Sequence, residues 1–318
     1  MKKFRQQTLG ELGELGVIRR LVHGLPARAD VVVGPGDDCA VVRIADKARY
    51  DYLLKSDPVV EGVHFTRETP GAAVGHKALA RVLSDMAAMG GEGLWALVDI
   101  TAPAGTSLAR LMAIRAGLSK LARRWRVAIV GGDVSRGRDL AVHVFGVGRV
   151  PRGQAVLRSG ARKGDYLFVT GTLGGSERGK HLKFEPRLAE GQWLRNRHWA
   201  TAMIDLSDGL ATDLKHLIRS SRVGAELWLN AIPLSPAVKK TTSWRKAAQR
   251  AITDGEDYEL LFSVPTAKSA ELLRAWKKVF AAPCTYIGRI TSQRYVIAGL
   301  DARGRRIPLK AAGYEHFR

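Results

Sequence analysis

Two hydrophobic patterns alternate along this chain, and their alternation restricts the fold more than any other feature. Apolar residues recur at helical spacing in three early segments, residues 9–23, 78–87 and 107–125. Short β-branched or apolar runs, bounded by Gly and Asp, read as strands and separate these helices. They are residues 31–33, 39–44, 50–55, 94–100, 128–130 and 140–150. A chain that alternates in this way predicts an α/β fold.

The same alternation starts again after Pro151-Arg152-Gly153. Helices are expected at residues 210–218 and 267–280, and strands at residues 166–170, 225–229, 259–264, 286–290 and 296–300. A length of 318 residues also exceeds the usual size of one compact core. We therefore expect two domains, residues 1–150 and 151–318.

Acidic residues are scarce, yet they recur in turns at the ends of apolar runs, and all but one of these turns contain glycine. The chain has 51 Lys and Arg against 30 Asp and Glu, and the acid-bearing turns are residues 34–38, 56–57, 131–133, 205–209 and 254–257. Ligands bind at strand-end loops of α/β folds, and Asp supplies the hard oxygen ligands that Mg²⁺ prefers. Asp beside Gly is also ordinary turn chemistry, and only the recurrence favours a function. Converging carboxylates predict a site for several magnesium ions that holds a triphosphate.

The familiar nucleotide motifs are missing. Residues 174–180 fit the first part of a P-loop, but His181 stands where that loop needs a Ser or Thr hydroxyl for Mg²⁺. Gly34-Pro35-Gly36 and Gly146-Val147-Gly148 lack the third glycine of a dinucleotide fingerprint. A nucleotide must therefore bind in another way.

Taken in order, the motifs resemble those of the thiamine-monophosphate kinases, which share a superfamily with aminoimidazole ribonucleotide synthetase and selenophosphate synthetase. The matching segments run nearly end to end, at residues 34–40, 56–65, 77–90, 130–133, 157–161, 184–188, 204–210, 255–262 and 313–317. The resemblance implies a two-domain fold like that of aminoimidazole ribonucleotide synthetase, with mixed sheets flanked by helices. It also implies a homodimer that pairs through the N-terminal domains.

The activity implied by this resemblance is direct in-line transfer of the ATP γ-phosphate to thiamine monophosphate, with Mg²⁺ as cofactor and thiamine diphosphate as product. The implied metal ligands are Asp38, Ser56, Asp57, Asp85, Asp133, Asp205 and Asp208, among which Asp57, Asp85, Asp133 and Asp208 would be catalytic. ATP would contact Gly132, Asp133, Arg158 and Ser207, and the thiamine substrate would contact His64, Glu256 and Tyr314. Without the resemblance, His64 could pack beside Phe65, Tyr314 could be a core residue and Arg158 could be a solvated loop charge.

Two positions depart from the family pattern. Lys55 and Ser56 precede Asp57, where the family usually has two hydroxyl residues, and Val134 replaces a hydroxyl after Gly131-Gly132-Asp133. Lys55 could replace part of a metal's charge, which puts the occupancy of one magnesium position in question.

A formal net charge of +21 favours polyanionic partners, so a basic nucleic-acid-binding protein on this fold is a competing interpretation. The basic residues are spread through the chain, without a dense tail or zinc-finger spacing, and nucleic acid is therefore disfavoured. Another ATP-using enzyme of the superfamily with a different acceptor is the nearer alternative. However, the chain lacks both the reactive N-terminal Cys of a selenophosphate synthetase and the C-terminal Cys of a hydrogenase-maturation member.

The expected location is the cytoplasm. Cys39 and Cys284 are the two cysteines, and the lack of a CxxC pair suggests neither a disulfide framework nor a structural zinc site. The N-terminus lacks the pattern of a signal peptide, and no run approaches the ~20 apolar residues of a membrane span.

Overall fold

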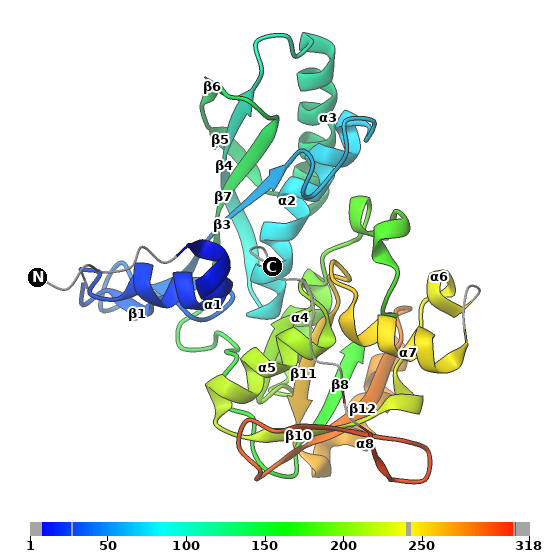
Figure 1. Ribbon diagram of the computed structural model, residues 1–318. Helices are drawn as coiled ribbons and strands as arrows, with labels where there is room; N and C mark the ends of the chain where they lie inside the picture. The colour runs from blue at the N-terminus through cyan, green and yellow to red at the C-terminus, as the bar shows by residue number, and fades with distance from the viewer. Residues whose placement is uncertain (1–7, 27, 240–242, 308, 310–318) are drawn as a thin grey trace, which may run out of the picture.

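The computed structural model describes residues 8–26, 28–239, 243–307 and 309, which form two mixed seven-stranded sheets flanked by helices (Figure 1). The first sheet has the order β1-β2-β3-β7-β4-β5, and β6 also pairs with β4. Its strands are β1 (Val31–Val33), β2 (Ala40–Val42), β3 (Tyr50–Val60), β4 (Glu92–Ala102), β5 (Ala128–Gly131), β6 (Val134–Arg136) and β7 (Ala141–Pro151). The β4–β5 and β4–β6 pairs are parallel, whereas the long β3, β7 and β4 strands pair antiparallel.

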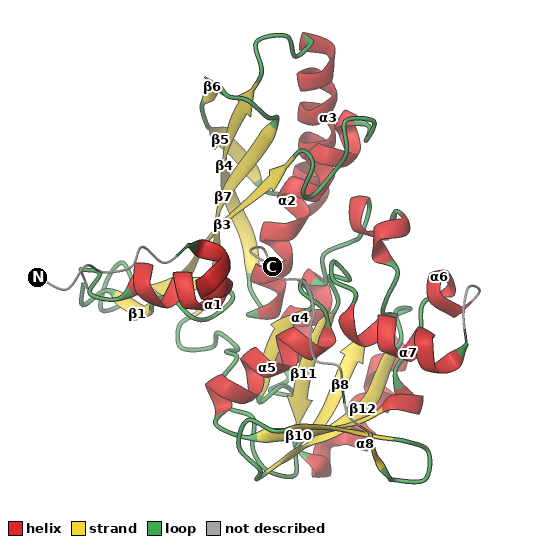
Figure 2. Ribbon diagram, viewed as in Figure 1, coloured by secondary structure: helices red, strands yellow, loops and turns green. Residues whose placement is uncertain are grey.

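Two helices, α2 (Gly71–Ala88) and α3 (Leu108–Trp125), lie on one face of the first sheet (Figure 2). Glycine allows them to approach closely, because a Cβ at Gly117 would lie 1.9 Å from the carbonyl oxygen of Ala72. The α1 helix (Leu9–Val22) begins at a capping box formed by Thr8 and Glu11. Its Gly13 has φ 63°, a left-handed conformation that kinks the helix and that glycine adopts readily.

The second sheet has the order β14-β13-β10-β12-β8-β11-β9. Its strands are β8 (Tyr166–Thr170), β9 (Ala202–Asp205), β10 (Gly224–Trp228), β11 (Leu260–Val264), β12 (Cys284–Thr291), β13 (Ile297–Leu300) and β14 (Arg306–Ile307). The α-helices of this half are α4 (Leu188–Asn196), α5 (Leu210–Ser221), α6 (Pro236–Lys239), α7 (Trp244–Thr253) and α8 (Thr266–Val279). Three short 3₁₀ turns are η1 (Ser176–Arg178), η2 (Lys180–Leu182) and η3 (Leu229–Ala231).

The α2 helix is buried by both halves of the chain. Its apolar residues Leu79, Val82, Leu83 and Met86 are at most 1% exposed and belong to a core that also contains Phe168 and Phe262 of the second sheet. The α4 helix packs directly on α2, since a Cβ at Gly191 would lie 2.0 Å from the carbonyl oxygen of Ala87. Polar groups on α2 therefore face a buried junction between the two sheets.

The α/β prediction is confirmed, and the expected helices and strands are present with shifted ends. The turn predicted at Ser56-Asp57 is wrong, because β3 continues through both residues to Val60 in an eleven-residue ladder with β7. The strands β6, β9 and β14 were not predicted, because runs of two to four residues are too short to show an alternation. The helices α4, α6 and α7 were not predicted either. The domain boundary at Pro151-Arg152-Gly153 stays a prediction.

Among the described helices, none has the length and hydropathy needed to cross a membrane.

Candidate active site

Three buried carboxylates from different elements meet at the junction between the two sheets. Asp38 lies in the turn before β2, Asp85 on α2, and Asp205 at the end of β9. One ligand oxygen from each lies within 4.8 Å of the other two. Their relative exposures are 1%, 6% and 4%. We call these three residues the acidic cluster.

The charges of the acidic cluster are only partly compensated by protein groups. Burial, reinforced by the charge of Asp38, raises the pKa of Asp205 to about 7, although Ser84 donates a hydrogen bond of 2.7 Å to its carboxylate. Burial also raises the pKa of Asp85 well above its usual range. Asp38 Oδ2 is buried and has no hydrogen-bond partner among the described residues. A hard cation with oxygen ligands, such as Mg²⁺, fits this donor set.

Basic side chains border the acidic cluster on two sides. Arg158 Nη2 lies 2.7 Å from Asp38 Oδ1. The backbone N–H of Arg158 also donates to the carboxylate of Asp37, whose pKa burial and the neighbouring Asp38 raise to about 6. On the other side, Lys55 Nζ lies 2.9 Å from Asp85 Oδ1. Both contacts hold carboxylate oxygens in place before any ligand binds.

Asp57 joins the site through β3. Side chains alternate along a strand, so Asp57 and Lys55 lie on the same face, and Lys55 Nζ is 3.6 Å from Asp57 Oδ2. Arg81 Nη2 of α2 lies 4.0 Å from the other carboxylate oxygen of Asp57. Ser56 projects from the opposite face of β3 and is exposed. Its predicted role as a metal ligand stays a prediction.

The turn that carries Ser207 and Asp208 follows Asp205 directly and leads into α5. Gly209 has φ 101°, which lets the chain turn sharply into the helix. The backbone N–H of Asp208 donates to Asp213 Oδ2 at 3.1 Å. Burial, with the nearby charges of Asp208 and Asp205, raises the pKa of Asp213 well above its usual range. The carbonyl oxygen of Ser207 accepts a hydrogen bond from the backbone N–H of Glu256 at 2.6 Å.

The two described residues predicted to face the thiamine substrate meet at a buried lysine. Lys77 of α2 has a side chain that is 0% exposed, and its Nζ lies 2.6 Å from both the carbonyl oxygen of His64 and Glu256 Oε1. His181 Nδ1 lies 2.8 Å from Glu256 Oε2 and 2.9 Å from Lys77 Nζ. Burial opposes the charge of Glu256, but His181 and Lys77 outweigh it and lower the pKa of Glu256 to about 2. Glu256 is therefore a fixed anion.

Sequence reasoning did not assign roles to Lys77, His181 or Asp213. A usable signal was present for Lys77, because it falls on the buried face of a helix, where lysine is rare unless paired. Asp213 gave the same kind of signal, because it falls on the apolar face of the predicted helix, between Leu210 and Leu217. His181 gave none, because its partners Lys77 and Glu256 lie 104 and 75 residues away in the sequence. Tyr314 lies outside the described residues.

Gly132 and Asp133 lie apart from the acidic cluster within one chain. Asp57 pairs with Val144 of β7, and Val144 pairs with Val98 of β4, beside which Gly132 and Asp133 lie. This path crosses three strand spacings, or roughly 14 Å. A Cβ at Gly132 would lie 1.9 Å from the carbonyl oxygen of Val98, so only glycine fits there. Asp133 is exposed and lines a hollow of about 380 Å³.

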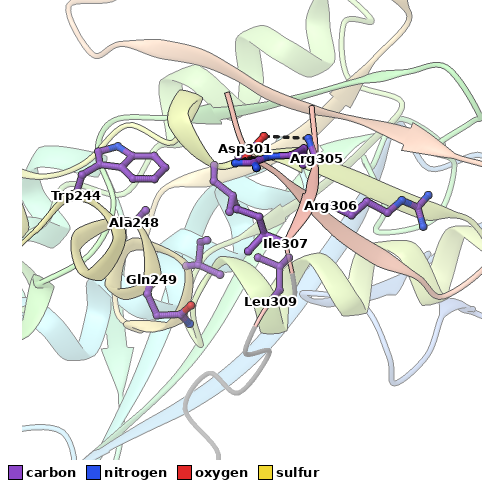
Figure 3. A pocket seen from close by; sticks show the side chains of 10 residues that line it. Trp244, Ala248, Gln249, Asp301, Arg305, Arg306, Ile307 and Leu309 are labelled. Carbon is purple, nitrogen blue, oxygen red and sulfur yellow. Dashed lines mark hydrogen bonds and ion pairs between the residues drawn. The ribbon is translucent and has the colours of Figure 1, made fainter. Parts of the chain in front are cut away.

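Two further hollows lie away from the acidic cluster. One, of about 310 Å³, is on the face of the first sheet opposite α2 and α3, and its lining is Trp95, Ala96, Leu97, Val130, Phe145 and Val147. The other, of about 480 Å³, is formed by α7 and the last described strands (Figure 3). An ion pair of 2.8 Å between Asp301 and Arg305 lies at its edge. None of the described residues predicted as metal ligands lines it.

The sequence of this chain is similar to those of known proteins. Residues 36–150 match the family model described as AIR synthase related protein, N-terminal domain. The thiamine-monophosphate kinase of Escherichia coli K12 is 35% identical over 332 aligned residues, which cover 96% of this chain and 98% of that protein.

Solved structures extend the likeness to the whole fold. The structure of AaThiL complexed with AMPPCP and TMP superposes with a TM-score of 0.83 at 30% identity, and covers 99% of this chain and 100% of that one. The thiamine-monophosphate kinase of Stenotrophomonas maltophilia K279a gives a TM-score of 0.74 at 31% identity, with coverages of 92% and 95%. Sequence and fold agree over nearly the whole length, and the chain belongs to the thiamine-monophosphate kinase family.

Proposed function

We propose that this protein transfers the γ-phosphate of ATP directly to thiamine monophosphate in a Mg²⁺-dependent reaction. The observation that carries the proposal is the acidic cluster, which lies buried between the two sheets of a chain that belongs to this kinase family. The related AaThiL is known as a complex with AMPPCP and TMP, which supports ATP and thiamine monophosphate as the two substrates.

Asp38, Asp85 and Asp205 would hold the magnesium, with Asp57 and Asp208 at its edges. When bound, Mg²⁺ would neutralise charge on the phosphate oxygens of the nucleotide. Arg158 already holds Asp38, and its Nε is buried without a partner among the described residues, so this guanidinium has capacity left for a phosphate oxygen. We assign Arg158 and Ser207 to ATP.

The acceptor side would be formed by His64 and Glu256, which Lys77 and His181 hold in place. Glu256 has φ 62°, a left-handed conformation that is uncommon for a non-glycine residue and that fixes the direction of its side chain. A fixed carboxylate suits recognition of the cationic thiazolium ring of thiamine. The acceptor is a phosphate that is largely deprotonated at neutral pH, so the reaction needs orientation more than a strong general base.

We also propose a homodimer that forms through the open face of the first sheet. Trp95, Leu97 and Phe145 are 45%, 41% and 37% exposed there, and they line the hollow of about 310 Å³. An exposed apolar patch of this kind is typical of a protein interface. Within one chain, Asp133 lies about three strand spacings, or roughly 14 Å, from Asp57. We therefore assign Gly132 and Asp133 to the site of the opposite subunit in this dimer.

The reaction is tested by incubating purified protein with ATP, Mg²⁺ and thiamine monophosphate, and following thiamine diphosphate by chromatography. We expect product that EDTA abolishes and that unphosphorylated thiamine cannot replace. Folded protein that binds ATP but forms no thiamine diphosphate would contradict the proposed acceptor and favour another acceptor of the same superfamily. In the same assay, Tyr314→Ala is expected to raise the KM for thiamine monophosphate more than the KM for ATP.

The shared site is tested by mixing two inactive variants, Asp38→Asn and Asp133→Asn, after reversible dissociation of the dimers. If the two aspartates serve one site from opposite subunits, about half of all dimers are mixed and every mixed dimer contains one intact site, so about a quarter of the wild-type activity returns. If both aspartates serve a site within one chain, every mixed dimer has two damaged sites. No recovery of activity would then refute the assignment of Asp133 to the opposite subunit.

A further inference from the structure

Lys55 occupies the space between two carboxylates that the family resemblance assigns to metal binding. Its Nζ lies 2.9 Å from Asp85 Oδ1 and 3.6 Å from Asp57 Oδ2. A Mg²⁺ ion that joined these two oxygens would lie about 2 Å from each, in the volume that the ammonium group now fills. Lysine and metal ion therefore exclude each other at this point.

The surroundings hold the Lys55 side chain in this position. Lys55 is on β3, in the antiparallel ladder with β7, and its side chain is only 23% exposed. Its ammonium group therefore stays between the carboxylates of Asp57 and Asp85, within ion-pair distance of both.

The rest of the acidic cluster remains open to a cation. Asp38 and Asp205 have ligand oxygens within 4.8 Å of one on Asp85, and neither forms a hydrogen bond or an ion pair with Lys55. Asp38 Oδ2 is buried without a partner among the described residues. The lysine thus neutralises the Asp57–Asp85 side of the site and leaves the Asp38–Asp205 side for a divalent ion.

We propose that Lys55 is a built-in cation that takes the place of one divalent metal ion between Asp57 and Asp85. The site therefore binds one fewer divalent ion than the same site with a hydroxyl residue at position 55. This inference rests on the proposed function, because it concerns the magnesium site of the kinase. It predicts that the metal count depends on a residue that makes no direct bond to any metal.

The test counts bound Mn²⁺, by electron paramagnetic resonance of the free ion, for wild-type protein, Lys55→Met and Lys55→Thr. Each protein is titrated with Mn²⁺ alone and with Mn²⁺ in the presence of AMPPCP. Lys163→Met, which removes an exposed lysine from a surface loop, is the matched control. We expect both position-55 variants to bind about one more ion per chain than wild-type protein and the control.

Thermal stability supplies a second readout that does not depend on turnover. Removing Lys55 leaves Asp57 and Asp85 facing each other, so both variants should melt below wild-type protein in EDTA. Mg²⁺ should then raise their melting temperatures by more than it raises that of wild-type protein. Equal Mg²⁺-induced shifts in all four proteins would overturn the inference.

A crystal of wild-type protein grown with Mn²⁺ and AMPPCP tests the inference without any variant. We expect anomalous density at Asp38 and Asp205 and none between Asp57 and Asp85. An ion between Asp57 and Asp85, with Lys55 turned away, would refute the replacement while leaving the kinase assignment intact. Failure of every protein to bind Mn²⁺ would instead overturn the metal site itself, and the inference with it.

Discussion

The pKa of Asp205 predicts how the stability of the metal-free protein depends on pH. Burial raises this pKa from an ordinary 3.8 to about 7, so the folded protein holds the proton more tightly than the unfolded chain. The protonated Asp205 carboxyl contributes fully to the free energy of unfolding below pH 4. This contribution falls by about 1.4 kcal/mol per pH unit as the pH rises toward 7. Asp37 and Asp257, whose pKa values burial raises to about 6, act in the same direction.

Asp205→Asn isolates the contribution of this one carboxyl, because asparagine resembles the protonated acid in size. Between pH 5 and pH 7 the free energy of unfolding of wild-type protein should fall relative to that of the variant by about 3 kcal/mol. Urea unfolding in EDTA at several pH values, followed by tryptophan fluorescence, measures the difference. The buried Trp199 and Trp276 lie in the C-terminal half and report on its packing.

Asp139→Asn, which changes an exposed acid, is the control and should give a profile parallel to that of wild-type protein. Mg²⁺ binds ionised carboxylates, so above pH 7 it should restore stability to wild-type protein and far less to Asp205→Asn. A difference between wild-type protein and Asp205→Asn that stays constant from pH 5 to pH 8 would refute the argument that burial destabilises this carboxylate.

Three further outcomes are expected. Gly117→Ala should lower stability by more than about 3 kcal/mol or prevent folding, since its Cβ would lie 1.9 Å from a backbone oxygen of α2. Gly105→Ala, with open space around its Cβ, should unfold like wild-type protein in the same denaturant titration. Glu256→Gln should raise the KM for thiamine monophosphate at least tenfold and destabilise the fold, because Lys77 would keep a buried charge without its anion; an unchanged KM would exclude Glu256 from the acceptor side. Asp133→Asn should nearly abolish phosphoryl transfer without changing the melting temperature, because Asp133 is exposed; full activity would remove its proposed metal role.

The sequence predicted most elements because their signals are local. Helical spacing on α2, for example, follows from the residues that α2 itself contains. The error at Ser56-Asp57 has a physical cause. Two polar residues before a proline look like the end of a strand, but pairing with β7 over eleven residues continues the strand through them.

Some features of the candidate site could also be predicted from the sequence, and others could not. The sequence by itself identified the candidate metal-binding carboxylates, because acids recur in turns of a chain whose net charge is +21. The order of its motifs also identified the family. It also marked Lys55 as a departure from the family pattern. Each of these features can be read from neighbouring residues.

Only the tertiary structure decided which carboxylates meet. Asp38, Asp85 and Asp205 are separated by more than 45 residues at each step, and they converge because α2 is buried between the two sheets. The same burial brings Lys77 into contact with both His64 and Glu256. It also places the ammonium group of Lys55 between the carboxylates of Asp57 and Asp85, which the sequence alone could not show. Charge interactions fall off with distance and strengthen with burial, and both quantities are set by packing between segments that are remote in the sequence.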